Sequence, residues 1–219
     1  MDWDALRLSL LVGVSATALS VLLGLPAAWL LARKRFPGRR IASALVLAPV
    51  LLPPTVLGYY LLQAVGRRSL IGGALDDLFG FSPVFHWTGA ALAAFVVSAP
   101  FLIRTAQAGF EAIEPLYEEA ARASGANEPA VFLRVTLPLA WPSVAAGAAM
   151  AFARAIGEFG ATLMVAGSVP GRTRTLPIAI YEAAQTGRAA DALAMSLLLT
   201  FAALGIILIA AALPRARRR

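Results

Sequence analysis

Long stretches without a charged residue constrain the fold of this chain more than any other feature. Crossing the hydrocarbon core of a bilayer takes roughly 17–25 mostly apolar residues, because a helix rises 1.5 Å per residue. Strands of a membrane barrel would instead alternate apolar and polar residues over segments of about ten, and the sequence lacks that pattern. Five charge-free stretches are long enough for a helix to span: 8–32, 41–66, 78–103, 135–153 and 192–214.

Composition supports a membrane protein and excludes a soluble enzyme. Charged residues make up 14% of the chain, against about 25% in soluble domains. The absence of cysteine excludes disulfides, thiolate metal sites and a cysteine nucleophile. We therefore predict an all-α membrane protein with a single domain over residues 1–219. Its five transmembrane helices are expected near residues 8–32, 41–66, 86–108, 139–167 and 192–213.

The basic residues predict which way the chain faces. Cytoplasmic loops of membrane proteins are enriched in Lys and Arg. Twelve of the 19 basic residues fall on one side, which predicts an N-terminus outside and a C-terminus inside. The first stretch follows Asp2 and Asp4 rather than basic residues, so we expect a retained span and not a cleaved signal. The twelve are Arg33, Lys34, Arg35, Arg39, Arg40, Arg104, Arg122, Arg134, Arg215, Arg217, Arg218 and Arg219, and the last four read as an anchor beside anionic lipid.

The segment at 111–138, between the third and fourth spans, predicts two short cytoplasmic helices. Pro115 suits the first turn of a helix, and Gly125 supplies the left-handed residue that ends one. Asn127 followed by Pro129 then starts the second helix. Leu137-Pro138 is expected to close the unit where the fourth span begins.

The spacing within this segment resembles a known motif. Glu119-Ala120-Ala121 is followed after three residues by Gly125, and after nine more by Val135-Thr136-Leu137-Pro138. This pattern resembles the EAA loop of permease subunits of binding-protein-dependent ABC importers, which have Ile where Val135 stands. The resemblance implies the type I importer fold, also called MetI-like, and a coupling helix that docks in a cleft of a cytoplasmic ATPase. The residues implied in that contact are Glu118, Glu119, Ala120, Ala121, Gly125, Leu137 and Pro138. The alternative, an amphipathic helix lying on lipid, needs a basic polar face, whereas this helix is net acidic.

The same resemblance implies partner proteins, among them an ATPase whose function this chain cannot perform. A Walker A loop requires Gly-x-x-x-x-Gly-Lys-Ser/Thr, yet the only lysine, Lys34, is followed by Arg35. The ATPase, with its ATP and Mg, must therefore be a separate chain, and no cofactor or metal is expected on this one. The family implies a homodimer, two ATPase subunits and an external binding protein, in a bacterial cell membrane and without nucleic acid.

Two features inside the spans are candidates for the transport route. Pro49, Pro53 and Pro54 interrupt the second span, which predicts either a bent helix facing the route or a packing kink. Arg154 and Glu158 lie one turn apart in the fourth span, where ionisable groups are costly unless they pair or face water. Such a pair either lines the route or fixes helix packing.

Three sequence segments, one of which contains this pair, indicate which group of importers the chain resembles. Residues 154–162, 51–60 and 171–181 resemble oxyanion importers, and most of all permeases for molybdate, with tungstate and sulfate as alternatives. Oxyanions are held by backbone N–H groups and hydroxyls. The 172–188 segment either attracts the anion, meets the binding protein or is a solvated loop. The residues expected at the route or its gate are Pro53, Pro54, Thr55, Arg154, Gly157, Glu158, Phe159, Gly160 and Thr162.

Two other classes of protein fit the residues less well. A membrane serine protease needs a Ser/His pair, but the only histidine, His86, sits beside Trp87 at the edge of the third span. A metal-dependent lipid transferase needs clustered aspartates, and Asp76-Asp77 is the only such cluster. A channel that works without ATP would share the spans but would leave the EAA-like loop unexplained.

Overall fold

A computed structural model describes residues 2–212, with side chains through residue 209, and every regular element in that range is helical. The all-α fold class is therefore confirmed. Four helices are long and apolar enough to cross a membrane, and a fifth crossing results if one bent helix pair counts as a span. The predicted anchor at Arg215–Arg219 lies outside the described residues.

The first long helix runs over Trp3–Arg33 and contains one wide turn. It consists of α1 (Trp3–Leu19), the π-helical turn η1 (Ser20–Gly24) and α2 (Leu25–Arg33). Asp2 caps its start by accepting the Ala5 N–H at 3.0 Å. The π turn ends just before Pro26, whose ring nitrogen cannot donate to the carbonyl one turn back.

The second predicted span, 41–66, is a sharply broken helix rather than a continuous crossing. It is divided into α3 (Arg39–Leu45), α4 (Ala48–Leu51) and α5 (Pro54–Val65). The helix direction bends by 109° between Arg39–Leu51 and Pro54–Val65. Pro53 and Pro54 cause the break, because a residue before proline avoids the helical region, and Leu52 is extended with ψ 143°. A short helix, α6 (Leu70–Phe79), follows α5.

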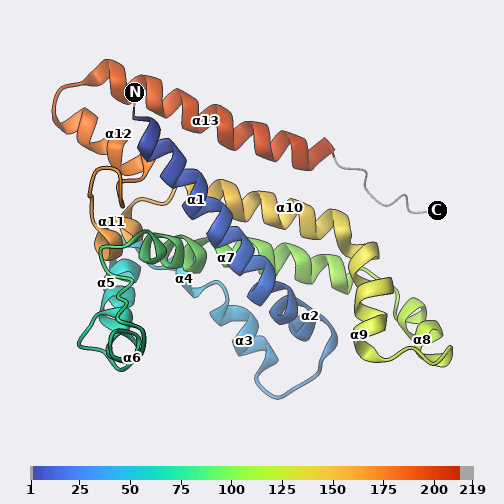
Figure 1. Cartoon of the computed structure of the whole chain (residues 1–219). Helices are drawn as coiled ribbons and strands as arrows, with labels where there is room; N and C mark the ends of the chain where they lie inside the picture. The colour runs from blue at the N-terminus through green and yellow to red at the C-terminus, as the bar shows by residue number, and fades with distance from the viewer. Residues whose placement is uncertain (1, 213–219) are drawn as a thin grey trace.

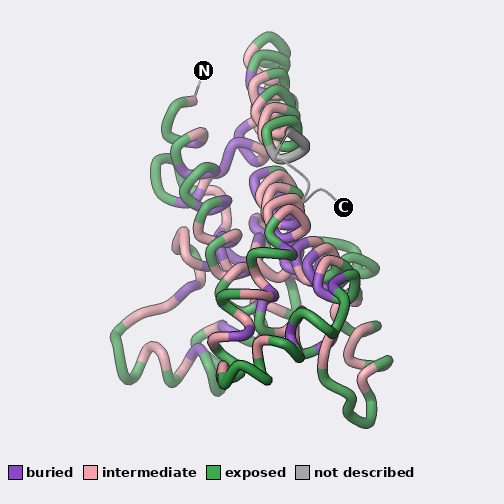
Figure 2. Tube along the Cα trace, turned by 90° about the vertical axis from the view of Figure 1, so that its right-hand side faces the viewer, coloured by how far each residue is buried: buried purple, intermediate pink, exposed green. Residues whose placement is uncertain are grey.

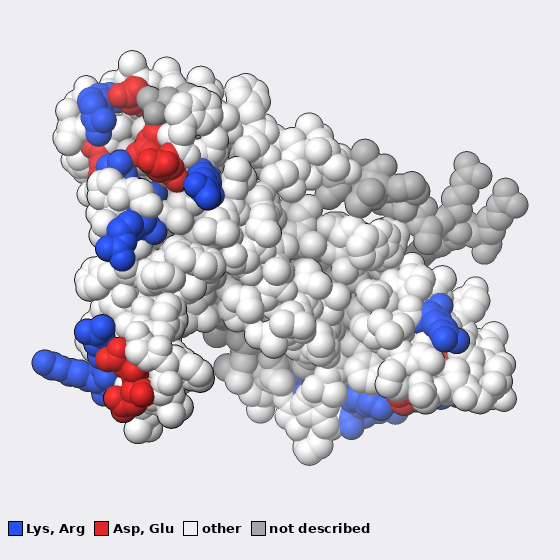
Figure 3. Space-filling model, in the orientation of Figure 1, with Lys and Arg blue, Asp and Glu red and all other residues white. Residues whose placement is uncertain are grey.

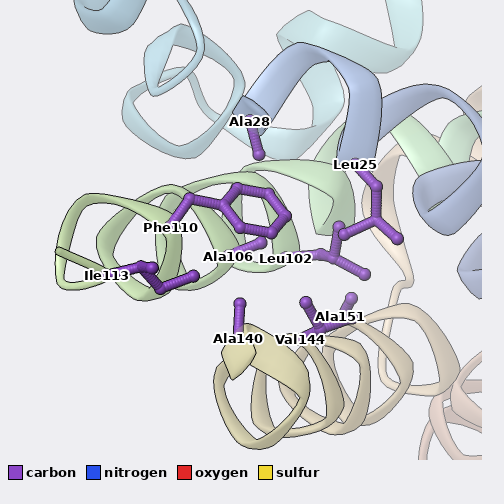
Figure 4. Close-up of a cluster of buried hydrophobic side chains, with 9 residues drawn as sticks. All are labelled: Leu25, Ala28, Leu102, Ala106, Phe110, Ile113, Ala140, Val144 and Ala151. Atoms are coloured by element: carbon purple, nitrogen blue, oxygen red, sulfur yellow. The ribbon is translucent and has the colours of Figure 1, made fainter. Parts of the chain in front are cut away.

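The helix α7 (Trp87–Glu111) lies at the centre of the packing and α10 (Leu137–Ile156) lies against it. Their contact is close because the residues are small: a Cβ on Gly147 would lie 3.2 Å from the Leu102 Cα. Figure 4 shows the buried cluster in which α2 packs against both helices. Its members are Leu25, Ala28, Leu102, Ala106, Phe110, Ile113, Ala140, Val144 and Ala151.

The fourth predicted span, 139–167, is also interrupted. The helix begins earlier, with α9 (Glu128–Val131) and the π turn η2 (Phe132–Thr136), and continues through Pro138 into α10. Leu137-Pro138 therefore does not close the preceding unit as expected, because the π turn accommodates the missing proline N–H. Beyond Ile156 the chain breaks at Gly157–Phe159 and restarts as α11 (Gly160–Ala166).

The chain ends with α12 (Leu176–Gln185) and the long helix α13 (Ala189–Ala212). Only 6% of the most apolar window of α13 is buried, far less than the 61% of α7, so α13 presents most of its surface outward (Figure 2). Figure 1 shows α8 (Pro115–Ala123) and α9 at one end of the long helices and α12 at the other. The two ends are thus separated by the membrane-length helices.

We predict that Gly58→Val separates α5 from α11. A Cβ at Gly58 would lie 2.7 Å from the Ala161 Cα, a backbone atom that cannot step aside. Overpacking of this kind costs about 1–3 kcal/mol, so the melting temperature in detergent should fall by several degrees. Gly205→Ala is the matched control, because nothing lies within 4 Å of its Cβ position. An unchanged melting temperature for Gly58→Val would contradict the close α5–α11 contact.

Candidate functional site

The first candidate site is the segment 111–138, and its local structure follows its sequence signals. Pro115 occupies the first turn of α8, and Gly125 has a left-handed φ of +87°. The Asn127 side chain caps the next helix by accepting the Ala130 N–H at 3.0 Å. The two short helices predicted here are confirmed, although the second is continuous with α10.

Adjacent glutamates in α8 have opposite environments. Glu119 is exposed, whereas Glu118 is only 4% exposed. The Glu118 Oε1 accepts hydrogen bonds from Arg33 Nε at 3.0 Å and from the Thr136 hydroxyl at 2.7 Å. Glu118, which was predicted to contact the ATPase, therefore contacts its own chain in this structure, because two donors from other helices enclose its carboxylate.

The opposite face of α8 is free within the described chain. Leu116 and Tyr117 are 67% and 55% exposed, and Ala120 is exposed as well. A shallow hollow of about 510 Å³ lies where α8 turns into α9, lined in part by Ala121, Ser124 and Gly125. Of the remaining predicted contacts, Leu137 is half-buried and Pro138 is exposed. The segment thus combines an anchored inner face with an apolar and acidic outer face.

An ion pair closes the turn between the two short helices. Arg122 Nε lies 2.7 Å from Glu128 Oε1, and this hydrogen bond raises the pKa of the Arg122 guanidinium above its ordinary value. Both partners are exposed, so the pair contributes little to stability. Its geometric effect is to link α8 to the start of α9 across Gly125.

The second candidate site is the break at Gly157–Phe159. Glu158 lies in this break with its side chain 1% exposed, and its Oε2 is 2.8 Å from Arg154 Nη2. Its Oε1 accepts the Ala161 N–H at 2.9 Å, so the carboxylate also caps α11. Arg154 and Glu158 therefore pair, as their spacing allowed, and the Arg154 side chain remains 31% exposed.

The two helix breaks meet in space. A Cβ on Gly160 would lie 3.0 Å from the Pro54 Cβ and 3.4 Å from the Thr55 Cγ2, so the starts of α5 and α11 are in contact. Pro53, Pro54 and Thr55 are exposed, but Thr162 is buried and its hydroxyl has no hydrogen-bond partner. The Phe159 ring packs 5.1 Å from that of Tyr181 in α12. Thr55 is thus the accessible hydroxyl at this junction, and Thr162 is enclosed.

Some charged residues that were predicted to lie in loops form ion pairs with residues far away in the sequence. On the face shown in Figure 3, charged side chains gather at the ends of the long helices and leave an uncharged band between them. Arg174 belongs to the segment predicted to attract the anion, to meet the binding protein or to be a solvated loop. Its Nη2 lies 2.6 Å from Asp2 Oδ2 and its Nη1 lies 3.2 Å from Glu182 Oε2. Arg33 was predicted only to mark one side of the membrane, yet it pairs with Glu118, which is 85 residues away. Partners this far apart in the sequence leave no local pattern from which their contact could be predicted.

We predict that Glu158→Ala destabilises the protein more than Glu158→Gln. Glutamine keeps an oxygen that can accept the Ala161 N–H and loses only the charge, whereas alanine also removes the cap. A lost helix cap costs about 1 kcal/mol, so the alanine variant should melt measurably below the glutamine variant in detergent. Equal melting temperatures would show that the carboxylate does not cap α11.

Comparison with known proteins places this architecture in a family. The family model described as "Binding-protein-dependent transport system inner membrane component" matches residues 20–218. The Molybdenum transport system permease protein ModB of Escherichia coli (strain K12) is 44% identical over 185 residues, covering 84% of this chain and 81% of that protein. The protein of the same name from Mycobacterium tuberculosis (strain ATCC 25618 / H37Rv) is 45% identical over 206 residues, covering 93% and 76%. The Sulfate transport system permease protein CysW of Synechococcus elongatus is 41% identical, covering 82% and 63%.

Solved structures agree on the fold. The MetNI methionine ABC transporter, in inward-facing conformations, matches with a TM-score of 0.74 at 21% identity, covering 98% of this chain and 95% of that chain. The resemblance to the EAA-loop permeases and the MetI-like fold expected from it are therefore confirmed. This chain belongs to the family of binding-protein-dependent transport system inner membrane components, and it is a permease component rather than an ATPase.

Proposed function

We propose that this chain is the permease subunit of an ATP-driven importer that carries molybdate into the bacterial cytoplasm. The observation that carries the proposal is the segment 111–138, where a short helix is held by its own chain and leaves its other face free. The cargo is supported by relatives named for molybdenum transport that share about 44% of their residues over most of the chain. One relative is named for sulfate, so sulfate is the alternative cargo.

In this proposal two copies of the chain form one route, and each copy docks one ATPase subunit through α8. Glu119, Ala120 and Gly125 make the contact, and an external binding protein delivers the anion at the opposite end. The apolar surface of α5 supports a second copy, because Tyr59 and Tyr60 are 48% and 57% exposed beside the broken span. The N-terminus then lies outside and the α8–α9 end lies in the cytoplasm.

The route passes the junction of the two helix breaks. A lone carboxylate would repel a dianion, but Arg154 lies 2.8 Å from Glu158 and neutralises it. Thr55 and the backbone N–H groups near Gly160 can donate hydrogen bonds to tetrahedral oxygens. Both helix breaks contribute to this region. One lies at Pro53 and Pro54, and the other runs from Gly157 to Phe159. When the ATPases close, the coupling helices shift and access alternates between the two sides.

We expect Glu119→Lys and Gly125→Pro to weaken association with the ATPase and to lower uptake at least tenfold. The first reverses an exposed charge on α8, and the second is incompatible with a φ of +87°, since proline fixes φ near −65°. Co-purification of the ATPase and ATP-dependent uptake into proteoliposomes would measure both effects. Asp77→Lys is the matched control, because Asp77 is an exposed acid in α6. The importer assignment fails if both variants retain wild-type ATPase binding and uptake.

The cargo is tested separately, at the level of delivery. Radiolabelled molybdate, tungstate and sulfate are offered to the cognate external binding protein, and the loaded protein is added to proteoliposomes containing the complete transporter. We expect molybdate to bind and to enter, with unlabelled sulfate competing poorly. Preferential binding and uptake of sulfate would overturn the choice of anion and leave the importer assignment intact.

A further inference from the structure

The ATPase-coupling segment is attached to the end of the first long helix by a polar cluster, and the proposed function gives this cluster no part in transmitting movement. Arg33 is the last residue of α2, and its side chain is 15% exposed. Besides Glu118, it reaches the Ile113 carbonyl, to which Nη2 donates at 3.1 Å. The Arg33 guanidinium thus contacts α8 through Glu118 and the turn between α7 and α8 through Ile113.

The cluster also reaches the long helix Glu128–Ile156, near its start. Thr136, in η2, is fully buried and donates its hydroxyl proton to Glu118 Oε1 at 2.7 Å. Arg122 adds a second positive charge, with its Nη2 3.7 Å from Glu118 Oε2. The carboxylate therefore has a partner on α2, on its own helix and on η2. Charge-assisted hydrogen bonds of this kind are about twice as strong as neutral ones and fix geometry.

The surrounding apolar contacts make this cluster part of a rigid body. Ile113, whose carbonyl Arg33 holds, belongs to the same buried cluster as Leu25 and Ala28 of α2 (Figure 4). That cluster also contains residues of α7 and α10. Both polar and apolar contacts therefore connect the base of α8 to α2. Because of these contacts, α8 cannot be displaced by bending at its base alone.

We propose that Arg33, Glu118 and Thr136 form a fixed joint that passes movement of the coupling helix α8 directly to the first long helix, Trp3–Arg33. This inference rests on the proposed docking of α8 to an ATPase. It adds the first helix to the elements that the ATPase moves, and it gives the two adjacent glutamates different tasks. Glu119 faces the partner, whereas Glu118 is a positioning residue that acts through Arg33 and Thr136.

The test uses the complete transporter in proteoliposomes, loaded with radiolabelled molybdate through its binding protein. Glu118→Gln leaves Arg33 without its counter-charge, and Arg33→Gln leaves the buried Glu118 with only the more distant guanidinium of Arg122, at 3.7 Å. We expect each to retain ATPase association but to lower the molybdate imported per ATP hydrolysed about tenfold, the effect of losing one charge-assisted hydrogen bond. The double variant, which leaves two amides able to bond each other, should return to within about threefold of wild type.

One further test variant and two controls keep the test decisive if the glutamine variants assemble poorly. Thr136→Val is nearly isosteric and removes only the hydroxyl, so we expect a loss of about threefold in molybdate per ATP with normal assembly. Thr17→Val is its control, because that hydroxyl bonds only the Gly13 carbonyl of its own helix. Arg67→Gln controls for the loss of an arginine, since its ion pair with Asp76 lies between α5 and α6.

The outcomes separate the joint from the proposed function. Wild-type ratios of molybdate to ATP in the single variants and in Thr136→Val, or a double variant as poor as the product of the singles, would overturn the joint. A merely structural role would lower assembly or the melting temperature and leave the ratio unchanged, which also overturns it. If instead the wild type and the Arg67→Gln control show no ATP-dependent uptake, the proposed function itself fails.

Discussion

The close packing of small side chains around α7 is the constraint on which the rest of the structure depends. Apolar side chains gain little by leaving lipid for protein, so helices in a membrane associate through close contact and buried hydrogen bonds. The alanines and glycines of α7 allow α1, α2, α10 and α11 to approach it, and 61% of its most apolar window is buried. Each candidate site lies where a helix packed on α7 ends or breaks.

Each end of this core has a buried carboxylate that is paired with an arginine. At the α8 end, Arg33 and Thr136 hold Glu118 and leave the neighbouring Glu119 free for a partner. At the break after α10, Glu158 is neutralised by Arg154 and also caps α11. Buried carboxylates therefore orient short helices at both places, because an unpaired charge there would be too costly to keep.

The sequence predicted what depends on local signals and missed what depends on distant ones. Pro115, Gly125 and Asn127 act on their immediate neighbours, and the helices that they begin or end were predicted correctly. The fourth span was predicted as one stretch over 139–167, in which Gly157 and Gly160 allow either close helix approach or local unwinding. Apolar residues continue on both sides of the break at Gly157–Phe159, so hydropathy alone cannot separate one helix from two. The inward orientation of Glu118 was missed because its partner Arg33 is 85 residues away. Neither the residue type nor its spacing distinguishes it from Glu119.

In the proposed function, α8 presents one face to an ATPase and turns the other into its own chain. Thiol accessibility tests it directly, because the sequence contains no cysteine. Single variants Leu116→Cys, Tyr117→Cys, Glu119→Cys and Thr136→Cys would be treated with a bulky charged thiol reagent, with and without the ATPase. We expect the first three thiols to react and to be protected by the ATPase, while the thiol at the fully buried position 136 reacts in neither state. Equal labelling at all four positions, or no protection by the ATPase, would contradict it.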